Sequence, residues 1–99
     1  MNGFAELELQ NDVLIVKGRI EFDNVVSTWQ KGLELMKKLT IIRVDLASVT
    51  DSDSSSLALL IEWTREAAKN HKKIVFLNIP KFVQDLARVS GIDTLLPSE

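Results

Sequence analysis

The chain has 99 residues, with 12 basic and 14 acidic side chains and a formal net charge of −2. This length fits one domain, over residues 1–99, and 45% hydrophobic with 26% charged residues is an ordinary globular composition. The slightly acidic balance argues against a nucleic-acid-binding protein, which usually carries a basic surface. Cysteine is absent, which excludes disulfide bonds, thiolate metal sites and a cysteine nucleophile.

The sequence predicts no segment that inserts into a membrane. The opening residues, MNGFAELELQ, contain neither the basic region nor the apolar run of a signal peptide. The longest unbroken apolar run, Leu57–Ile61, is far shorter than the roughly 20 residues that span a bilayer. We therefore expect any association with a membrane to depend on a partner protein.

The first elements are predicted to be a hairpin of two strands. Residues 4–9 alternate apolar and polar side chains, and residues 13–16 form a continuous apolar run. Asn11 and Asp12 lie between them as a two-residue turn candidate.

From Asp23 onward, the spacing of apolar residues becomes helical. Its predicted buried face consists of Val26, Trp29, Leu33, Met36 and Thr40. Asp23 or Asn24 can cap the start of this helix. Gly32 lies inside it and either marks close packing against a neighbour or has no structural role.

The middle of the chain predicts a strand, a polar loop and a second helix. Residues 41–46 are rich in β-branched side chains, residues 47–56 are polar, and the helix is expected to begin near Ser55 or Ser56. Its predicted buried stripe consists of Leu57, Leu60, Ile61, Thr64 and Ala68. Its predicted solvent-facing side consists of Glu62, Arg65, Glu66 and Lys69.

The last third predicts a strand, a helix and a short tail. Residues 74–77 are strand-like, and Pro80 lies where the first turn of a helix tolerates proline. The predicted buried stripe of this third helix consists of Phe82, Leu86 and Val89. Gly91 is placed to end the helix, and residues 92–97 are expected to add a short edge segment.

The resulting order is β-β-α-β-α-β-α, which predicts an α/β fold with helices packed on a mixed sheet. The strand-helix-strand connections are expected to be right-handed parallel crossovers. In such sheets, functional residues gather in loops at the carboxyl ends of parallel strands. The polar loop that follows Leu46 is one of these loops.

The most unusual feature is the segment Asp51–Ser56, which four interpretations can explain. Its side chains can cap the following helix. The pair Asp51 and Asp53 resembles the acids of haloacid-dehalogenase-type phosphatases, although the expected strand ends earlier and the chain is short. Closely spaced oxygens suit Ca²⁺ or Mg²⁺, but the glycine and distal acid of such sites are missing. Finally, a serine at a helix start can be a regulatory phosphorylation site.

Other candidate residues do not combine into a catalytic set. His71 is the sole histidine and lies beside lysines in a predicted turn, and Asp45 has no nucleophile or base paired with it in the sequence. Leu59 and Trp63 lie off the predicted buried stripe, so they form either an exposed apolar patch or a partly buried flank. We therefore predict no enzyme activity, no catalytic residue, no metal site and no cofactor.

The stretch IRVDLASVTDSDSSSLALL, residues 42–60, resembles the signature of STAS domains. That signature is an apolar strand ending in Asp-Leu-Ser or a similar sequence, a short loop, and a hydroxyl- and glycine-rich segment that opens a helix. The resemblance extends over essentially the whole chain. In the anti-sigma factor antagonists of this family, a partner kinase phosphorylates the hydroxyl residue after the aspartate, and Ser54 after Asp53 matches that position.

Further residues are similar to the small STAS subunit of the Mla phospholipid-transport system. They are Gly18-Arg-Ile-Glu-Phe-Asp, Trp29, Leu57-Ala-Leu-Leu and the closing Leu95-Leu-Pro. This resemblance implies a cytoplasmic, non-enzymatic subunit, peripheral at the inner membrane, that binds the ATPase of an ABC transporter with a permease in the same complex. Ser55 and Ser56 stand where that group has glycine, and they are expected to alter the contact surface.

The resemblance implies a partner-binding surface of Asp53, Ser54, Ser55, Ser56, Leu57, Leu59 and Trp63, with Ser54 as the regulatory position. The alternative function is an anti-sigma factor antagonist that a kinase phosphorylates at Ser54. Because an isolated subunit exposes its interface, a weak homodimer is a further expected partner state.

Overall fold

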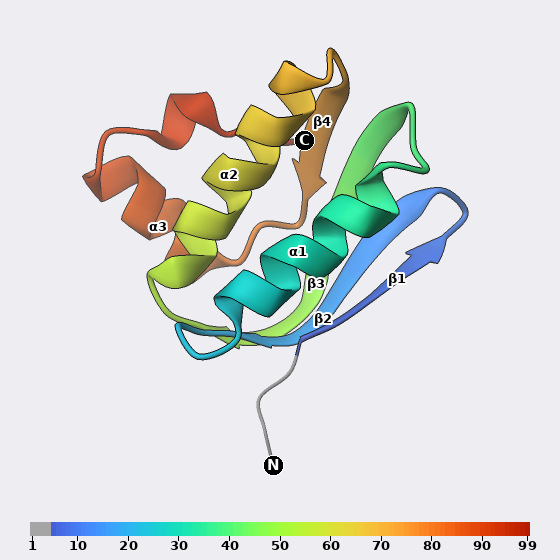
Figure 1. The fold of residues 1–99 in the computed structure, drawn as a ribbon. Helices are drawn as coiled ribbons and strands as arrows, with labels where there is room; N and C mark the ends of the chain where they lie inside the picture. The colour runs from blue at the N-terminus through green and yellow to red at the C-terminus, as the bar shows by residue number, and fades with distance from the viewer. Residues whose placement is uncertain (1–4) are drawn as a thin grey trace.

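The structure, a computed structural model, describes residues 5–99 and confirms the predicted order of elements (Figure 1). The strands are β1 (Glu6–Gln10), β2 (Val13–Ile20), β3 (Ile41–Ser52) and β4 (Lys73–Leu77). The helices are α1 (Val25–Met36), α2 (Ser55–Lys69) and α3 (Lys81–Val89), followed by the short 3₁₀ helix η1 (Asp93–Leu95). In this part of the chain, no helix has the length and apolar character needed to cross a membrane.

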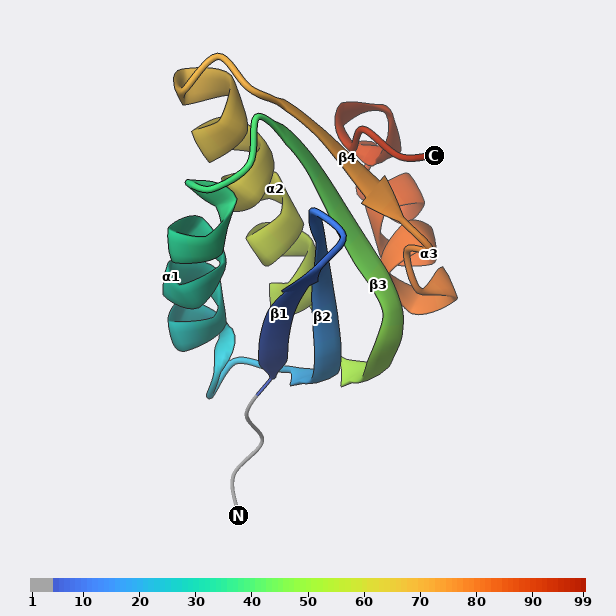
Figure 2. The ribbon, with the colours of Figure 1, turned by 90° about the vertical axis from the view of Figure 1, so that its right-hand side faces the viewer.

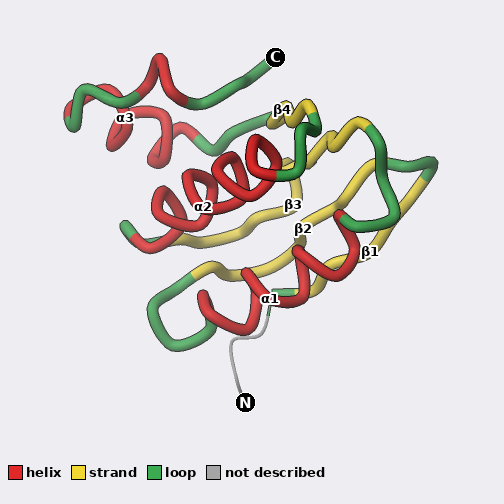
Figure 3. Tube along the Cα trace, turned by 45° about the horizontal axis from the view of Figure 1, so that its top comes forward, coloured by secondary structure: helices red, strands yellow, loops and turns green. Residues whose placement is uncertain are grey.

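The four strands form one mixed sheet in the order β1-β2-β3-β4, with β1 and β4 at its edges (Figure 2). β1 and β2 are antiparallel and are joined by Asn11 and Asp12, whose positive φ angles of 52° and 64° suit a tight hairpin turn. β2 pairs with β3, and β3 with β4, in parallel. Helices α1 and α2 cover one face of this sheet, and α3 packs beside α2 (Figure 1, Figure 3).

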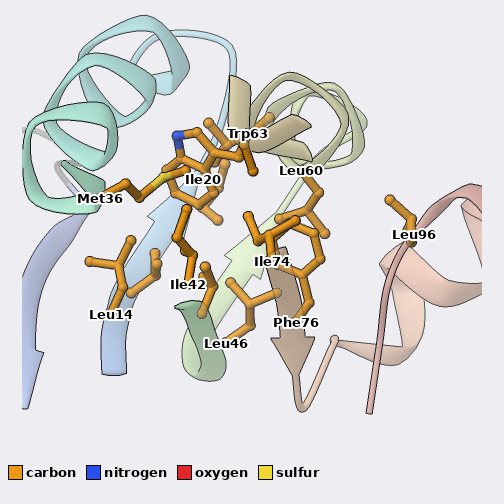
Figure 4. Packing of buried hydrophobic residues seen from close by; sticks show 14 of the residues in the cluster. Leu14, Ile20, Met36, Ile42, Leu46, Leu60, Trp63, Ile74, Phe76 and Leu96 are labelled. Carbon is orange, nitrogen blue, oxygen red and sulfur yellow. The ribbon is translucent and has the colours of Figure 1, made fainter. Parts of the chain in front are cut away.

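The core lies between the sheet and the helices (Figure 4). Leu14, Val44 and Phe76 lie opposite one another on three neighbouring strands, and all three are completely buried. Because side chains alternate along a strand, this register places Leu14, Val44 and Phe76, with the residues two positions away on each strand, on the helix-covered face.

Helices α1 and α2 approach each other closely at Gly32 and Trp63. A Cβ atom on Gly32 would lie 2.3 Å from Cζ2 of Trp63, which is completely buried. The Trp63 Nε1–H group donates a hydrogen bond to the carbonyl oxygen of Trp29 on α1, at 3.3 Å. Of the two interpretations of Gly32, close packing is therefore confirmed, whereas Leu59 and Trp63 form neither an exposed patch nor a partly buried flank, since both are buried.

The buried faces of the helices differ from the predicted stripes. The buried residues are Thr28, Gly32 and Met36 on α1, Leu57, Leu59, Leu60, Trp63 and Ala67 on α2, and Val83 and Ala87 on α3. Five residues that were predicted to be buried are exposed: Val26 (61%), Phe82 (51%), Val89 (83%), Thr40 and Ala68. The predicted stripes consist mainly of large apolar side chains, whereas the buried faces include small residues such as Gly32 and Ala87, and Gly32 allows the close approach of α1 and α2.

The prediction of a loop over residues 47–56 is wrong for the first half of this range. β3 continues to Ser52 because β2 is long enough to pair with it, with Lys17 opposite Ser48 and Ile20 opposite Ser52. Two register shifts interrupt this pairing, between Ile15 and Lys17 and between Gly18 and Arg19. The polar residues 47–52 are therefore an extension of β3 that pairs with β2, rather than a free loop.

The end of α3 follows the prediction, and the tail follows it in part. Gly91 has φ +74°, its N–H bonds to the Arg88 carbonyl at 3.0 Å, and the Ile92 N–H bonds to the Ala87 carbonyl at 2.9 Å. These two bonds form the Schellman motif that ends many helices at glycine. After η1, the Phe76 N–H donates to the Pro97 carbonyl at 2.7 Å and Ser98 forms an isolated parallel bridge with Phe76. The edge segment predicted over residues 92–97 is therefore confirmed only at its end, since Asp93–Leu95 form η1.

Replacing Gly91 with alanine is expected to lower the free energy of unfolding by about 1 kcal/mol. No atom lies within 4 Å of the added Cβ, so the cost comes from the left-handed backbone alone. Urea unfolding measures the change, with Ser90→Ala, at φ −81°, as the matched control in an ordinary helical conformation. Equal stability of Gly91→Ala and Ser90→Ala would contradict this account.

Candidate functional site

The candidate site lies where β3 passes into α2, at the carboxyl end of the parallel strands. Asp53 is the residue between these elements, and its backbone N–H donates to the Ile20 carbonyl at the end of β2, at 3.2 Å. Its Oδ2 accepts the Phe22 backbone N–H at 3.1 Å, and its Oδ1 accepts the Ser55 N–H at 2.9 Å. The Ser55 hydroxyl also donates to Oδ1. Asp53 therefore joins the β2–α1 connection to the start of α2.

The same carboxylate caps α2. Ser54 already has helical angles, φ −64° and ψ −16°, and makes no side-chain capping bond, so Asp53 fills the capping role from the position before it. Burial raises the pKa of Asp53, but hydrogen bonds from Ser55 and Phe22 outweigh this effect and leave the pKa below its ordinary value. The capping interpretation of this segment is thus confirmed for Asp53.

The three serines at the start of α2 differ sharply in exposure. Ser54 is exposed, whereas Ser55 and Ser56 are only 4% and 2% exposed. The Ser56 hydroxyl donates to the Asp53 carbonyl at 2.8 Å, and Ser55 bonds to the Asp53 carboxylate. The expectation that Ser55 and Ser56 add bulk to the contact surface is therefore wrong, because both side chains point inward to Asp53.

An apolar surface, which sequence analysis did not identify, lies beside Ser54. Phe22 is 71% exposed, and its backbone N–H is bonded to the Asp53 carboxylate that caps α2. Ala58 is exposed one helical turn after Ser54, on the same side of α2. An apolar depression of about 260 Å³ between α1 and α2 is lined by Val25, Val26, Trp29, Ala58, Leu59 and Glu62. We refer to Phe22 and this depression together as the α1–α2 apolar surface.

Acidic side chains surround this end of the sheet. They are Glu21, Asp23, Asp51 and Asp53, with Arg19 among them. The Arg19 guanidinium forms a 2.7 Å ion pair with Glu21, and this pair, together with the charges of Asp51 and Asp23, raises the pKa of Arg19. Because Arg19 is paired with Glu21, it does not neutralise the other acidic side chains, and the surface around Ser54 remains acidic.

The comparisons with known proteins agree with this fold. A family model described as "Mlab, STAS domain" matches residues 4–97. The chain belongs to the STAS-domain family. No curated protein matches the chain.

Solved STAS structures share the fold at low sequence identity. The unphosphorylated anti-sigma factor antagonist SpoIIAA superposes with a TM-score of 0.70 and 18% identity, covering 96% of this chain and 87% of that one. The phosphorylated form of SpoIIAA, a Bacillus cell fate determinant, gives 0.68 and 17%, covering 96% and 90%. An anti-sigma factor antagonist from Mycobacterium paratuberculosis gives 0.69 and 18%, covering 95% and 82%.

In this STAS domain, the predicted site residues separate into two groups. Asp53 and Ser54 reach the surface, as does the unpredicted residue Phe22. The remaining predicted contact residues are buried in this conformation: Ser55, Ser56, Leu57, Leu59 and Trp63. The exposed apolar residues in this region are Phe22, Val26 and Ala58.

The other sequence candidates have local structural partners. The Asp51 carboxylate accepts the Ser52 N–H at 2.9 Å. The Asp45 carboxylate accepts the Ala47 N–H at 2.9 Å and the Asn78 side-chain amide at 3.0 Å, which ties β3 to the end of β4. His71 is exposed in the turn before β4, at φ 58°. Across residues 5–99, no group of three acidic or histidine side chains is placed to hold a metal ion.

Proposed function

We propose that this STAS domain is a non-enzymatic regulatory or assembly subunit that binds the ATPase of an ABC transporter for phospholipid. The match to the Mla-type STAS family over residues 4–97 is the observation that carries this proposal. Such a subunit would work at the cytoplasmic face of the inner membrane, held there by the ATPase and its permease, and would need no cofactor of its own.

The proposed contact surface consists of Ser54 and the α1–α2 apolar surface. Ser54 offers an exposed hydroxyl at the start of α2, and Ala58 continues the same side of the helix. An aliphatic side chain of the partner can enter the depression and be removed from water, which favours association. Asp53 acts as a positioning residue, because its carboxylate, which caps α2, accepts the Phe22 backbone N–H.

The test compares the same substitution at two ends of one helix. Ala58→Glu places a charge in the proposed contact, whereas Ala68→Glu places it at an exposed position near the end of α2. We expect Ala58→Glu and Ser54→Glu to weaken binding of the ATPase at least tenfold, about 1.4 kcal/mol, and Ala68→Glu to leave binding unchanged.

Affinity capture of the tagged chain from its host, followed by mass spectrometry, identifies the partner. Recovery of an ABC ATPase by wild type and Ala68→Glu, but not by Ala58→Glu, supports the proposal. Capture of the ATPase at the same level by wild type, Ala68→Glu and Ala58→Glu would reject this placement of the contact. Failure of wild type to capture any ABC ATPase would reject the proposed function itself.

The alternative function is an anti-sigma factor antagonist in a partner-switching pathway. It is favoured by the accessible hydroxyl of Ser54, which directly follows an aspartate and lies where a kinase could reach it. Recovery of an anti-sigma kinase, together with a phosphate on Ser54 in the intact mass of the captured chain, would establish this alternative and overturn the transporter proposal.

A further inference from the structure

The charge around Ser54 indicates the chemistry of the partner surface. Asp23 and Asp51 are exposed, Asp53 is partly exposed, and Arg19 is paired with Glu21. We propose that the partner segment that docks here is basic, with an aliphatic side chain flanked by arginine or lysine. This inference rests on the proposed function, because it describes the partner at the same contact surface.

The net charge of −2 conceals a separation of charge between the two ends of the molecule. Lysines gather at the opposite end, after α1, at the end of α2 and at the start of β4: Lys37, Lys38, Lys69, Lys72 and Lys73. Figure 1 shows α2 running from the Ser54 end to this opposite end. A partner that approaches the acidic end is therefore selected by the local charge rather than by the small net charge.

The apolar and acidic features adjoin each other, which restricts the occupant further. The depression is lined by Val25, Val26, Trp29, Ala58 and Leu59, with Glu62 as its charged residue. Covering it with a neutral surface would take water away from Asp23 and Asp51 without replacing the lost hydrogen bonds. A flanking arginine replaces them, because its planar guanidinium can bond to a carboxylate through two N–H groups. An acidic segment would be repelled.

The first test reverses charge at each end of the molecule by the same amount. Asp23→Lys with Asp51→Lys changes the acidic end, and Glu34→Lys with Glu66→Lys is the control of equal charge at the lysine-rich end. Binding to the ATPase is measured by biolayer interferometry from about 50 to 500 mM NaCl. We expect wild-type affinity to fall at least tenfold over this range, mainly in the association rate, because salt screens such contacts.

The acidic-end variant is expected to bind at least tenfold more weakly at low salt and to lose the salt dependence, while the control binds within about twofold of wild type. Unchanged affinity and salt dependence in the acidic-end variant would overturn the inference. If Ala58→Glu still abolishes binding in that case, the proposed function stands and only the charge recognition fails.

A second test does not depend on the ATPase. An amphipathic leucine/lysine peptide and its leucine/glutamate counterpart are each titrated into the protein while its tryptophan emission is recorded. Trp29 lines the depression and reports on its occupancy. We expect the lysine peptide to shift the emission of wild type but not of the variant Asp23→Lys with Asp51→Lys, and the glutamate peptide to have no effect on wild type. Equal responses to both peptides, or none to either, would overturn the inference. Discrimination between the peptides without capture of an ATPase would reject the proposed function and retain the charge recognition.

Discussion

Gly32→Ala is expected to destabilise the protein by about 1–3 kcal/mol, although alanine is the better helix former by about 1 kcal/mol. The added Cβ would lie 2.3 Å from Cζ2 and 2.6 Å from Cε2 of Trp63. Neither side can yield easily, because Trp63 is completely buried and its indole N–H is bonded to the Trp29 carbonyl of α1. Urea unfolding measures the change, with Gln30→Ala on the exposed side of α1 expected within about 0.5 kcal/mol of wild type.

A double-mutant cycle shows whether the steric contact is the cause. Trp63→Phe removes the ring atoms nearest to Gly32 and destabilises the protein by leaving a cavity. In that background, Gly32→Ala is expected to cost much less, since the new methyl group occupies the space that the indole leaves. Additive losses in the double variant would show that the contact between Gly32 and Trp63 does not set the cost.

The strand and helix order could be predicted because each element carries its own periodic signal. The run at residues 74–77 and the helical spacing after Asp23 are local features, and the observed β4 and α1 follow them. The turn at Asn11 and Asp12 also depends on local backbone preferences. Local sequence therefore determines which elements form, and in what order, more clearly than how they face one another.

The orientation of the helices could not be predicted from large apolar residues. The close approach of α1 and α2 is at Gly32, and the small residue Ala87 is buried on α3, while Val26 and Val89 face solvent. A pattern of large residues cannot show which side of a helix meets a neighbour, because that choice depends on the residue opposite. The same limitation left Trp63 expected in an exposed patch or a partly buried flank, although it is completely buried.

The candidate site was predictable only in part for a related reason. Asp53 and Ser54 belong to a motif that is continuous in sequence. Phe22 joins them through a hydrogen bond that spans 31 residues, from its backbone N–H to the Asp53 carboxylate. Every residue except proline has a backbone N–H, so the residue type at position 22 does not indicate this bond. The link between Phe22 and Asp53 could therefore not be predicted from the sequence.

Asp53→Asn is expected to lower the free energy of unfolding by about 1–2 kcal/mol. Both carboxylate oxygens of Asp53 accept backbone N–H groups, Oδ1 from Ser55 and Oδ2 from Phe22. An asparagine can accept through one oxygen, and its amide nitrogen would then face the second N–H as donor against donor. Asp51→Asn is the matched control, because the single bond from the Ser52 N–H can be kept by the asparagine oxygen. Equal stability of the two variants in urea unfolding would contradict the bridging role of Asp53.

The pH dependence of the stability that Asp53 provides shows whether its charge or only its shape stabilises the fold. The pKa of Asp53 in the folded protein lies below its ordinary value of 3.8, so folding favours the ionised carboxylate. Its stabilising effect is therefore complete above pH 3.8 and is lost as the pH falls through the lower folded value. The difference in stability between wild type and Asp53→Asn should be constant from pH 7 to 5 and should shrink below about pH 4. Because the same carboxylate accepts the Phe22 N–H, Asp53→Asn should also weaken partner binding at pH 7 more than Asp51→Asn does, since both variants lose one negative charge but only Asp51→Asn keeps the bonds of Asp53. A difference in stability that stays constant down to pH 3 would mean that the shape of Asp53, rather than its charge, joins the β2–α1 connection to α2.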